Sequence, residues 1–317
     1  MKSINCIGVI VLDALSGPLV AYPIPKKKTQ TNTKTITFMP GGGAANTALA
    51  LAKMGLPAAV FSKVGNDFPG KFLIGELRKY NVKTAGIKIS STETTPFTFV
   101  GIHGDGDRSF VHTPGTNLSF CRNDIDLNKL LDTKFLFYQD LWVKPKLDNG
   151  PAKIILREAK KRGVTTLLDE CFGLGPRLAN LKPLLPYCDY FLPSYDDMLV
   201  IFPGCKVEVI AKKLIAFGVK TVVIKTGKHG CLVAGKGILI QIPALHIKKV
   251  VDTTGAGDCW DAGFIAGLAH GMDALDAARL GNAAAGCCIQ GIGGSANIPP
   301  YRMLENLISQ KAGQCHE

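Results

Sequence analysis

Two acids flank three small residues near the end of the chain, in VVDTTGAGDCWDAGF at residues 250–264. The small residues leave their backbone N–H groups unobstructed, and they are Gly255, Ala256 and Gly257. The next segment, Asp258–His270, is patterned as a helix, so these N–H groups converge at a helix N-terminus, which carries roughly half a positive charge. Asp258 beside such an anion hole can take a proton from an attacking hydroxyl while the N–H groups hold a phosphoryl group. The string predicts phosphoryl transfer, because a helix-capping role would account for Asp258 alone.

A second glycine-rich turn, PGGGAANTALALAKMG at residues 40–55, also precedes a helical pattern. It lacks the third glycine of a dinucleotide-binding GxGxxG motif and the GK[ST] of a Walker A loop. Two interpretations stay open: a turn that approaches a ligand closely, or a tight strand-to-helix turn in which Asn46 caps locally. Asp13, expected at the end of the first strand, favours a ligand, since ligands bind at strand carboxyl ends of a parallel sheet. Its carboxylate is a good acceptor for sugar hydroxyls.

Short β-branched runs alternate with helical patterns, which is typical of an α/β fold with a mostly parallel central sheet and helices on both faces. The expected strands are Ile4–Leu12, Ala58–Val64, Lys134–Tyr138, Thr165–Asp169, Tyr190–Pro193 and Thr221–Thr226. The clearest helices are Ala44–Met54, Pro69–Tyr80 with Asp67 as N-cap, and Pro151–Arg162. Residues 14–38 and 97–112 break this rhythm and are expected to form a small β-sheet that acts as a lid. We therefore expect residues 1–317 to form a single α/β domain with this lid as an appendage.

The composition argues against several classes of protein. The chain has 317 residues, 46% of them hydrophobic, and no run of 18 apolar residues that would predict a membrane span. The formal charge of +12 suits an anionic ligand, but the lysines lack the aromatic neighbours and motifs of nucleic-acid-binding proteins. Ten scattered cysteines without a CxxC pair indicate reduced thiols. The opening MKSINCIGVIVLDAL resembles a buried strand more than a secretion signal, so we expect a cytoplasmic protein.

Taken together, the motifs resemble the ribokinase-like (PfkB) family of carbohydrate kinases. GGGAAN at 41–46 and DTTGAGD at 252–258 match its two signature regions, and DGDR at 105–108 and KTGKHG at 225–230 extend the resemblance along the chain. The resemblance implies a ribokinase-like fold and phosphorylation of a sugar or sugar-like hydroxyl by ATP with Mg²⁺. In similar proteins a monovalent cation such as K⁺ can bind near the turn that begins here at Asp252. Their lids often pair between subunits, so a homodimer is expected.

The resemblance also implies roles for individual residues. Asp258 is the expected catalytic base beside the anion hole of residues 255–257. The expected sugar contacts are Asp13, Gly42, Gly43, Asn46 and Asp140, with Gln139 as the alternative to Asp140. The turn under the nucleotide phosphates is expected to contain Lys225, Thr226, Gly227 and Gly230, and Asn282 is expected against adenine. Lys225 fits an ordinary strand-end lysine equally well. Arg108 of the lid could reach a substrate oxygen or pair with Asp105 or Asp107.

One motif departs from the family pattern. The Asn-x-x-Glu that positions Mg²⁺ through water is replaced by PSYDD, which has Ser194 and Asp197 at the matching places. Asp197 could still order a hydrated Mg²⁺, because that ion usually keeps several waters. Ser194 followed by acids in the first turn is also typical of a helix N-cap. Both interpretations stay open.

Two further functions stay open as well. A nucleoside kinase would share the scaffold and would need an apolar or aromatic pocket near the lid to hold the base. A non-catalytic regulator that binds a sugar or nucleotide is disfavoured by the intact Asp258 and its glycines. His103 and His112 of the lid are interpreted as surface or packing residues. Trp142 and Trp260 are interpreted as core residues.

Overall fold

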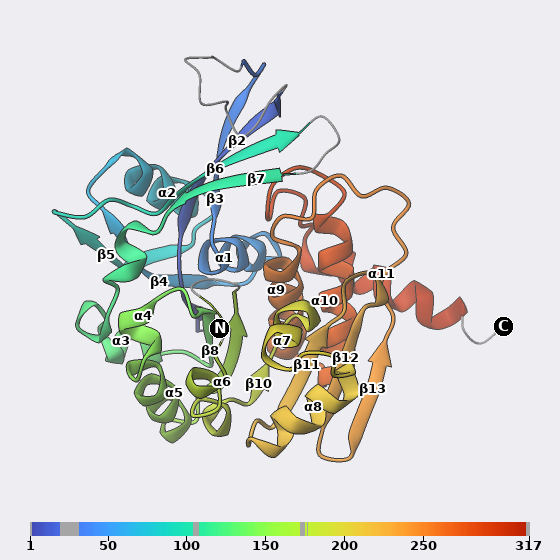
Figure 1. Ribbon diagram of the computed structural model, residues 1–317. Coiled ribbons are helices and arrows are strands. Elements are labelled where there is room, and N and C mark those ends of the chain that lie inside the picture. The colour runs from blue at the N-terminus through green and yellow to red at the C-terminus, as the bar shows by residue number, and fades with distance from the viewer. Residues whose placement is uncertain (1, 20–31, 104–107, 172–174, 176, 315–317) are drawn as a thin grey trace.

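Two β-sheets organise the protein, and the computed structural model describes residues 2–19, 32–103, 108–171, 175 and 177–314 (Figure 1). The larger sheet runs in the order β13 (Ile238–Ile242), β12 (Cys231–Gly235), β11 (Thr221–Lys225), β10 (Tyr190–Phe191), β9 (Thr165–Glu170), β8 (Phe135–Leu141), β1 (Ile4–Ile7), β4 (Ala58–Gly65) and β5 (Lys83–Ser90). From β11 to β5 the strands are parallel, and β12 and β13 add an antiparallel edge. The expected mostly parallel α/β sheet is confirmed.

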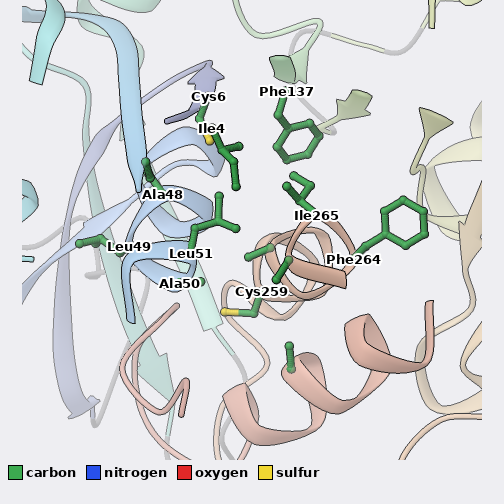
Figure 2. Packing of buried hydrophobic residues seen from close by; sticks show 14 of the residues in the cluster. Ile4, Cys6, Ala48, Leu49, Ala50, Leu51, Phe137, Cys259, Phe264 and Ile265 are labelled. Carbon is green, nitrogen blue, oxygen red and sulfur yellow. The ribbon is translucent and has the colours of Figure 1, made fainter. Parts of the chain in front are cut away.

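Helices cover both faces of this sheet because its strands alternate their apolar side chains between two cores. In β8, Phe135 and Phe137 enter one core, and Leu136 and Tyr138 enter the other. Figure 2 shows part of the first core, where side chains of β1 and β8 meet side chains from its helices. Its helices are α1 (Gly43–Lys53), α2 (Phe68–Lys79), α9 (Ala256–Ala269), α10 (Ala274–Cys288) and α11 (Tyr301–Gln314). Those of the second core are α3 (Leu127–Leu131), α4 (Pro145–Asp148), α5 (Pro151–Lys161), α6 (Leu178–Leu181), α7 (Tyr195–Ile201) and α8 (Val207–Ala216).

The smaller sheet has the order β3 (Ile36–Gly41), β2 (Val11–Leu19), β6 (Phe97–His103) and β7 (Arg108–Thr113). β2 pairs parallel with β6, and the other two pairings are antiparallel. In Figure 1 this sheet stands at one edge of the molecule above α1 and α2. The expected lid sheet is therefore confirmed, and its first strand begins three residues before the predicted segment.

The expected first strand, Ile4–Leu12, is wrong, because the chain makes two strands there. β1 ends at Ile7, and β2 begins at Val11 in the smaller sheet. Gly8 lies at the break, where a Cβ atom would come within 2.4 Å of Asp140 Oδ2. Asp13 consequently lies inside a strand of the lid sheet and not at the carboxyl end of a parallel strand.

The expected helices agree with the structure to within one or two residues. Asp67 caps α2 as predicted, since its side chain accepts the N–H of Gly70. Gly55 and Gly163 adopt positive φ just beyond α1 and α5, which is the backbone conformation that ends those helices. Across the described ranges, no helix combines the length and apolar character needed to span a membrane.

Candidate functional site

The turn before α9 is shaped by one glycine and one carboxylate. Gly255 is the N-cap of α9 with φ of 70°, and a Cβ atom there would lie 2.5 Å from the backbone of Gly294. Asp252 Oδ1 accepts the N–H of Thr254 at 2.7 Å, and Asp252 Oδ2 accepts the N–H of Gly293 at 3.1 Å. This places residues 255–257 at the start of a 14-residue helix, whose N-terminus favours an anion. The N–H of Ala256 donates to the carbonyl of Thr253 at 3.2 Å, so the predicted hole is not made of three free N–H groups.

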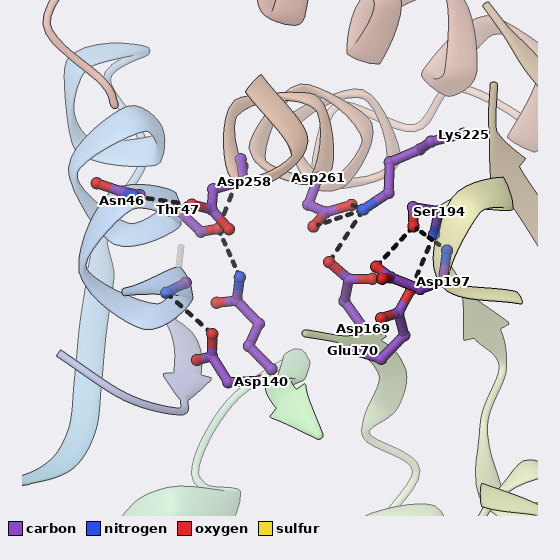
Figure 3. A network of polar contacts seen from close by, with 12 residues as sticks. Asn46, Thr47, Asp140, Asp169, Glu170, Ser194, Asp197, Lys225, Asp258 and Asp261 are labelled. Carbon is purple, nitrogen blue, oxygen red and sulfur yellow. Dashed lines mark hydrogen bonds and ion pairs between the residues drawn. The ribbon is translucent and has the colours of Figure 1, made fainter. Parts of the chain in front are cut away.

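Asp258 stands in the first turn of α9 and is held by side chains of α1 (Figure 3). Asn46 Nδ2 donates to Asp258 Oδ2 at 2.8 Å, and Thr47 Oγ1 donates to the Asp258 carbonyl at 3.1 Å. Gln139 Nε2 donates in turn to Thr47 Oγ1 at 2.8 Å. Burial and the nearby charge of Asp140 raise the pKa of Asp258 to about 7, although the hydrogen bond from Asn46 opposes this rise. A carboxylate with this pKa can take a proton at neutral pH.

A cavity of about 220 Å³ lies between residues of the N-terminal part of the chain and the DTTGAGD turn. It is lined by Val11, Asp13, Leu15, Gly42, Thr98, Val100, Phe110 and Thr254. Asp13 from the lid sheet and Thr254 from the DTTGAGD turn therefore face one space. Burial raises the pKa of Asp13 to about 6, and a hydrogen bond with Thr98 opposes the rise. Gly42 has φ of 84°, and a Cβ atom there would lie 2.6 Å from the carbonyl oxygen of Val9. The structure thus places the predicted sugar-facing carboxylate and Thr254 around one cavity, and residues 255–258 follow Thr254 in the chain without being among the lining residues.

Asp140 lies at the end of β8 but does not line this cavity. Its Oδ2 accepts the N–H of Val9 at 2.8 Å and its Oδ1 accepts the N–H of Gly43 at 3.1 Å. Its backbone has φ of 55°, and burial raises the pKa of its carboxyl. Asp140 thus fixes the glycine turn before α1. A direct contact of Asp140 or Gln139 with a sugar stays a prediction.

Beneath this turn lies a fully buried lysine, which sequence reasoning missed. Lys144 Nζ donates to the carbonyls of Gln139 at 2.6 Å and Asp140 at 2.5 Å. It is 3.5 Å from Asp148 Oδ1, which also accepts the hydroxyl of Tyr138 at 2.6 Å. Lys144 therefore satisfies the carbonyls of a strand end that must leave ordinary sheet geometry.

Lys225, at the end of β11, is engaged by two acids. Its Nζ is 2.9 Å from Asp169 Oδ2 and 3.1 Å from Asp261 Oδ1. Burial lowers the pKa of Lys225, but these carboxylates outweigh burial and raise it overall. A Cβ atom on Gly257 would lie 3.8 Å from the same Nζ, so the ammonium group stands beside the anion hole. Sequence reasoning missed Asp169 and Asp261, although Asp261 follows Asp258 by one helical turn.

The turn after β11 has the expected glycine geometry. Gly227 and Gly230 have φ of 57° and 91°. Thr226 precedes the short 3-10 helix Gly227–His229, and Gly230 follows it. Asn282 is buried in α10, where its Oδ1 accepts the indole N–H of Trp260 at 2.7 Å and its Nδ2 donates to the carbonyl of Pro243 at 2.9 Å. The predicted contacts of these residues with a nucleotide stay predictions. Trp260 and Trp142 are both buried, as expected for core residues.

Ser194 and Asp197 form the N-cap of α7. Ser194 Oγ accepts the N–H of Asp197 at 3.1 Å and donates to Asp197 Oδ2 at 2.7 Å. Glu170 at the end of β9 accepts the N–H of Ser194 at 2.9 Å. The capping interpretation of PSYDD is confirmed, and Glu170 is a third acid that sequence reasoning missed. A metal contact by Asp197 stays a prediction.

The remaining lid predictions fall partly outside the described residues. Residues 105–107 of the DGDR turn lie outside the described residues. The backbone of Arg108 is described and begins β7, but the side chains of Arg108 and His103 lie outside the described part of the structure. His112 is described, and its Nδ1 is 3.0 Å from Thr98 Oγ1. The cysteines among the described residues are all free thiols, as expected.

Comparisons with known proteins show the family and the fold of the chain. The family model for the pfkB family of carbohydrate kinases matches residues 1–300. An uncharacterized sugar kinase of Archaeoglobus fulgidus is 26% identical over 253 residues, which cover 79% of this chain and 98% of that protein. The structure of Arabidopsis thaliana ribokinase complexed with ribose and ATP is 25% identical, covers 97% of this chain and 98% of its own, and has a TM-score of 0.85. The nucleoside kinase of Burkholderia thailandensis, in complex with inosine, shares the fold at 20% identity, with coverage of 98% and 97% and a TM-score of 0.78.

Proposed function

Because the chain belongs to the pfkB family of carbohydrate kinases, we propose that it transfers the γ-phosphoryl group of ATP to a hydroxyl of a sugar or sugar-like molecule. The observation that carries this proposal is the cavity that Asp13, Gly42 and Thr254 line together. Four residues after Thr254, in the first turn of α9, Asp258 is held by a hydrogen bond from Asn46. Phosphoryl transfer to an alcohol requires a group that binds the substrate hydroxyls, a base that removes the proton and an anion hole for the phosphoryl group.

On the acceptor side, Asp13 accepts a hydrogen bond from a substrate hydroxyl, and the bare backbone at Gly42 and Gly43 lets the ring approach α1. Asp258 removes the proton from the hydroxyl that attacks. Asn46 keeps the Asp258 carboxylate oriented, because its amide nitrogen already donates to Asp258 Oδ2. The N–H groups of residues 255–257 face the charge that develops on the transferring group. The lid sheet helps to exclude water, which would otherwise compete as acceptor.

On the nucleotide side, we place the phosphates near Lys225 and the turn of Thr226, Gly227 and Gly230, and the adenine near Asn282. Arg108 of the lid is kept as a proposed contact to substrate. The site fits a divalent cation, since buried carboxylate oxygens of Asp169 and Glu170 have no hydrogen-bond partner. When bound, Mg²⁺ neutralises phosphate charge.

Three finer points belong to the same proposal. The monovalent cation would sit near Asp252, whose two oxygens each accept one backbone N–H, and a carboxylate oxygen has a second lone pair that can bind a cation. Initial rates in KCl against NaCl test this point. We also propose a homodimer through the lid sheet and a cytoplasmic location, the latter because the described cysteines are free thiols and the reaction consumes ATP.

The test is alcohol-dependent ADP formation by the full chain with ribose, fructose, 2-keto-3-deoxygluconate and adenosine. A rise of ADP with at least one sugar, absent in D258N, is expected. If none of the alcohols stimulates ADP formation, the proposal is contradicted, and a non-catalytic binding protein is favoured.

One observation favours a nucleoside as the second candidate substrate. Four of the eight residues around the cavity are large and apolar, namely Val11, Leu15, Val100 and Phe110. Such a wall offers no partner to hydroxyls but can pack against a planar base. If adenosine exceeds every sugar in kcat/KM, and F110A lowers kcat/KM for adenosine more than for ribose, the nucleoside function is preferred.

A further inference from the structure

Four carboxylates converge on the nucleotide side of the site, where β9, α7 and α9 meet (Figure 3). They belong to Asp169, Glu170, Asp197 and Asp261. Within the described part of the chain, Lys225 is the single basic side chain that ion-pairs with them, through Asp169 and Asp261. The cluster therefore has four carboxyl groups around one ammonium group.

Two oxygens in this cluster have no hydrogen-bond donor. They are Asp169 Oδ1 and Glu170 Oε2, and the two residues are only 6% and 7% exposed. A buried carboxylate oxygen without a partner is strongly unfavourable, so such oxygens are satisfied by a proton or a cation. Both side chains come from the end of β9, and Figure 3 shows them together beneath Lys225.

Asp197 and Glu170 each have one carboxylate oxygen bonded to Ser194, and they differ in burial, because Asp197 is half-buried whereas Glu170 is buried. One oxygen of Asp197 accepts the hydroxyl of Ser194, whose N–H is in turn accepted by the other oxygen of Glu170, Oε1. The cap of α7 thus orients Glu170 and leaves Oε2 without a donor. Because Lys225 Nζ also stands beside Gly257, these oxygens are near the place where phosphates are proposed to bind.

We propose that Asp169 and Glu170 bind the divalent cation that accompanies the nucleotide, and that Glu170, not Asp197, is the carboxylate added beside Asp169. The proposal rests on the proposed kinase function. Carboxylate oxygens suit a hard cation such as Mg²⁺, which commonly takes one or two carboxylates and completes its shell with water and phosphate oxygens. Over the described ranges, no three acidic, His or Cys side chains form a ready-made metal cage, so two carboxylates are the expected protein share.

The experiment measures metal-dependent nucleotide binding, without turnover. A non-hydrolysable ATP analogue is titrated by calorimetry into the full chain with and without MnCl₂, and free Mn²⁺ is followed by electron paramagnetic resonance. Wild type is expected to bind the analogue at least tenfold more tightly with Mn²⁺. Glu170→Gln keeps the oxygen that accepts the Ser194 N–H but loses the charge, so most of this gain should disappear. Asp169→Asn should also reduce it.

Asp196→Asn is the matched control, since Asp196 is an exposed acid in the first turn of α7 and should behave as wild type. Asp197→Asn separates the two candidate ligands and should retain most of the Mn²⁺-dependent gain. The proposal is overturned if E170Q retains the full gain, or if D197N alone abolishes it. Circular dichroism of each variant shows whether a loss reflects unfolding, and a misfolded E170Q leaves D169N to decide.

The result of the Mn²⁺ experiment can be distinguished from the result of the test for kinase activity. If sugars stimulate ADP release while E170Q keeps wild-type Mn²⁺ coupling, the kinase function stands and the metal assignment fails. If no alcohol stimulates ADP release but E170Q loses the coupling, the metal site stands on a protein that binds nucleotide without transferring phosphate.

Discussion

The carboxylate of Asp258 is the residue on which the proposed chemistry depends. It has one fixed hydrogen bond, from Asn46, and a pKa raised to about 7 by burial and by Asp140. Asp258→Asn keeps the shape and loses the base. We expect kcat to fall by roughly 10²- to 10⁴-fold, the range typical of general-base catalysis, with sugar binding retained. Initial rates of ADP release and calorimetric sugar binding measure the two effects. Near-normal kcat would remove Asp258 from this role.

The pH dependence of the rate follows from the same group. Asp258 must be deprotonated to act as a base, so kcat/KM should rise with pH through about 7 and then level off. Asn46 stabilises the charged form, and Asn46→Ala should therefore move the rising limb to higher pH. The pH profiles of kcat/KM for wild type and N46A measure the shift. Asn306→Ala, on the exposed surface of α11, is the matched control. An unmoved limb in N46A would show that another group controls the rate.

At the scale of elements, both ends of α9 carry a glycine with positive φ, but for different reasons. At Gly255 a Cβ atom would press on the backbone of Gly294 at 2.5 Å, whereas at Gly271 nothing lies within 4 Å. Gly271→Ala should cost only the left-handed backbone penalty, roughly 1–2 kcal/mol. Gly255→Ala should add a displacement of the anion hole, so kcat should fall strongly in that variant alone. Urea unfolding and initial rates compare the pair, and equal rates would contradict a shaped turn.

The end of β8 depends on the buried Lys144, which bonds to the carbonyls of Gln139 and Asp140 and pairs with Asp148. Lys144→Met should lower the free energy of unfolding by about 3–5 kcal/mol, because it leaves Asp148 as a buried acid without its cation. The unfolding midpoint in urea measures this loss. Lys146→Met, two residues along and exposed, should change the midpoint little. A K144M protein as stable as K146M would show that the pair contributes little.

Local sequence predicted the helices well because their signals are local. Asp67 before Pro69 and Gly55 after the apolar pattern act within one turn of chain, so they fix helix ends without tertiary information. The split of the first strand was not predictable in this way. At the break the carboxylate of Asp140 accepts the N–H of Val9, a contact between residues 131 positions apart that local sequence does not reveal.

The candidate site likewise contains residues that local sequence predicts and residues that only the tertiary structure brings together. Asp258 and the small residues Gly255, Ala256 and Gly257 form one contiguous string whose chemistry can be inferred from sequence. Asp169, Glu170 and Asp261 come from separate elements, and their meeting at Lys225 requires the sheet order and the packing of α9. From the sequence, Lys225 could be a phosphate contact or an ordinary strand-end lysine, and its acidic partners were not predicted.

At the scale of the whole molecule, one apolar face remains exposed on the lid sheet. The pairing register places Phe38, Ala14, Phe99 and Val111 in one row, opposite the face that carries Phe110 and the cavity. Ile36 lies two residues from Phe38 on the same face. Ile36, Phe38 and Val111 are 53%, 45% and 58% exposed. Between them Ala14 is only 2% exposed, so these exposed side chains lie on the two edge strands of the sheet. Exposed apolar side chains can mark interaction surfaces, and here a second copy of the chain is the partner we propose.

A dimer through this face predicts that one lysine can separate the subunits without altering catalysis. In Val111→Lys the charge would be buried against the partner, whereas Phe110 and Asp13 lie on the other face of the sheet. Light scattering after gel filtration should give about twice the chain mass of 33.8 kDa for wild type and a single chain mass for V111K. Val209→Lys, on the exposed surface of α8, should remain dimeric because that valine lies outside the lid sheet. A wild-type protein that stays monomeric at tens of micromolar, or a V111K protein that stays dimeric, would place the interface elsewhere.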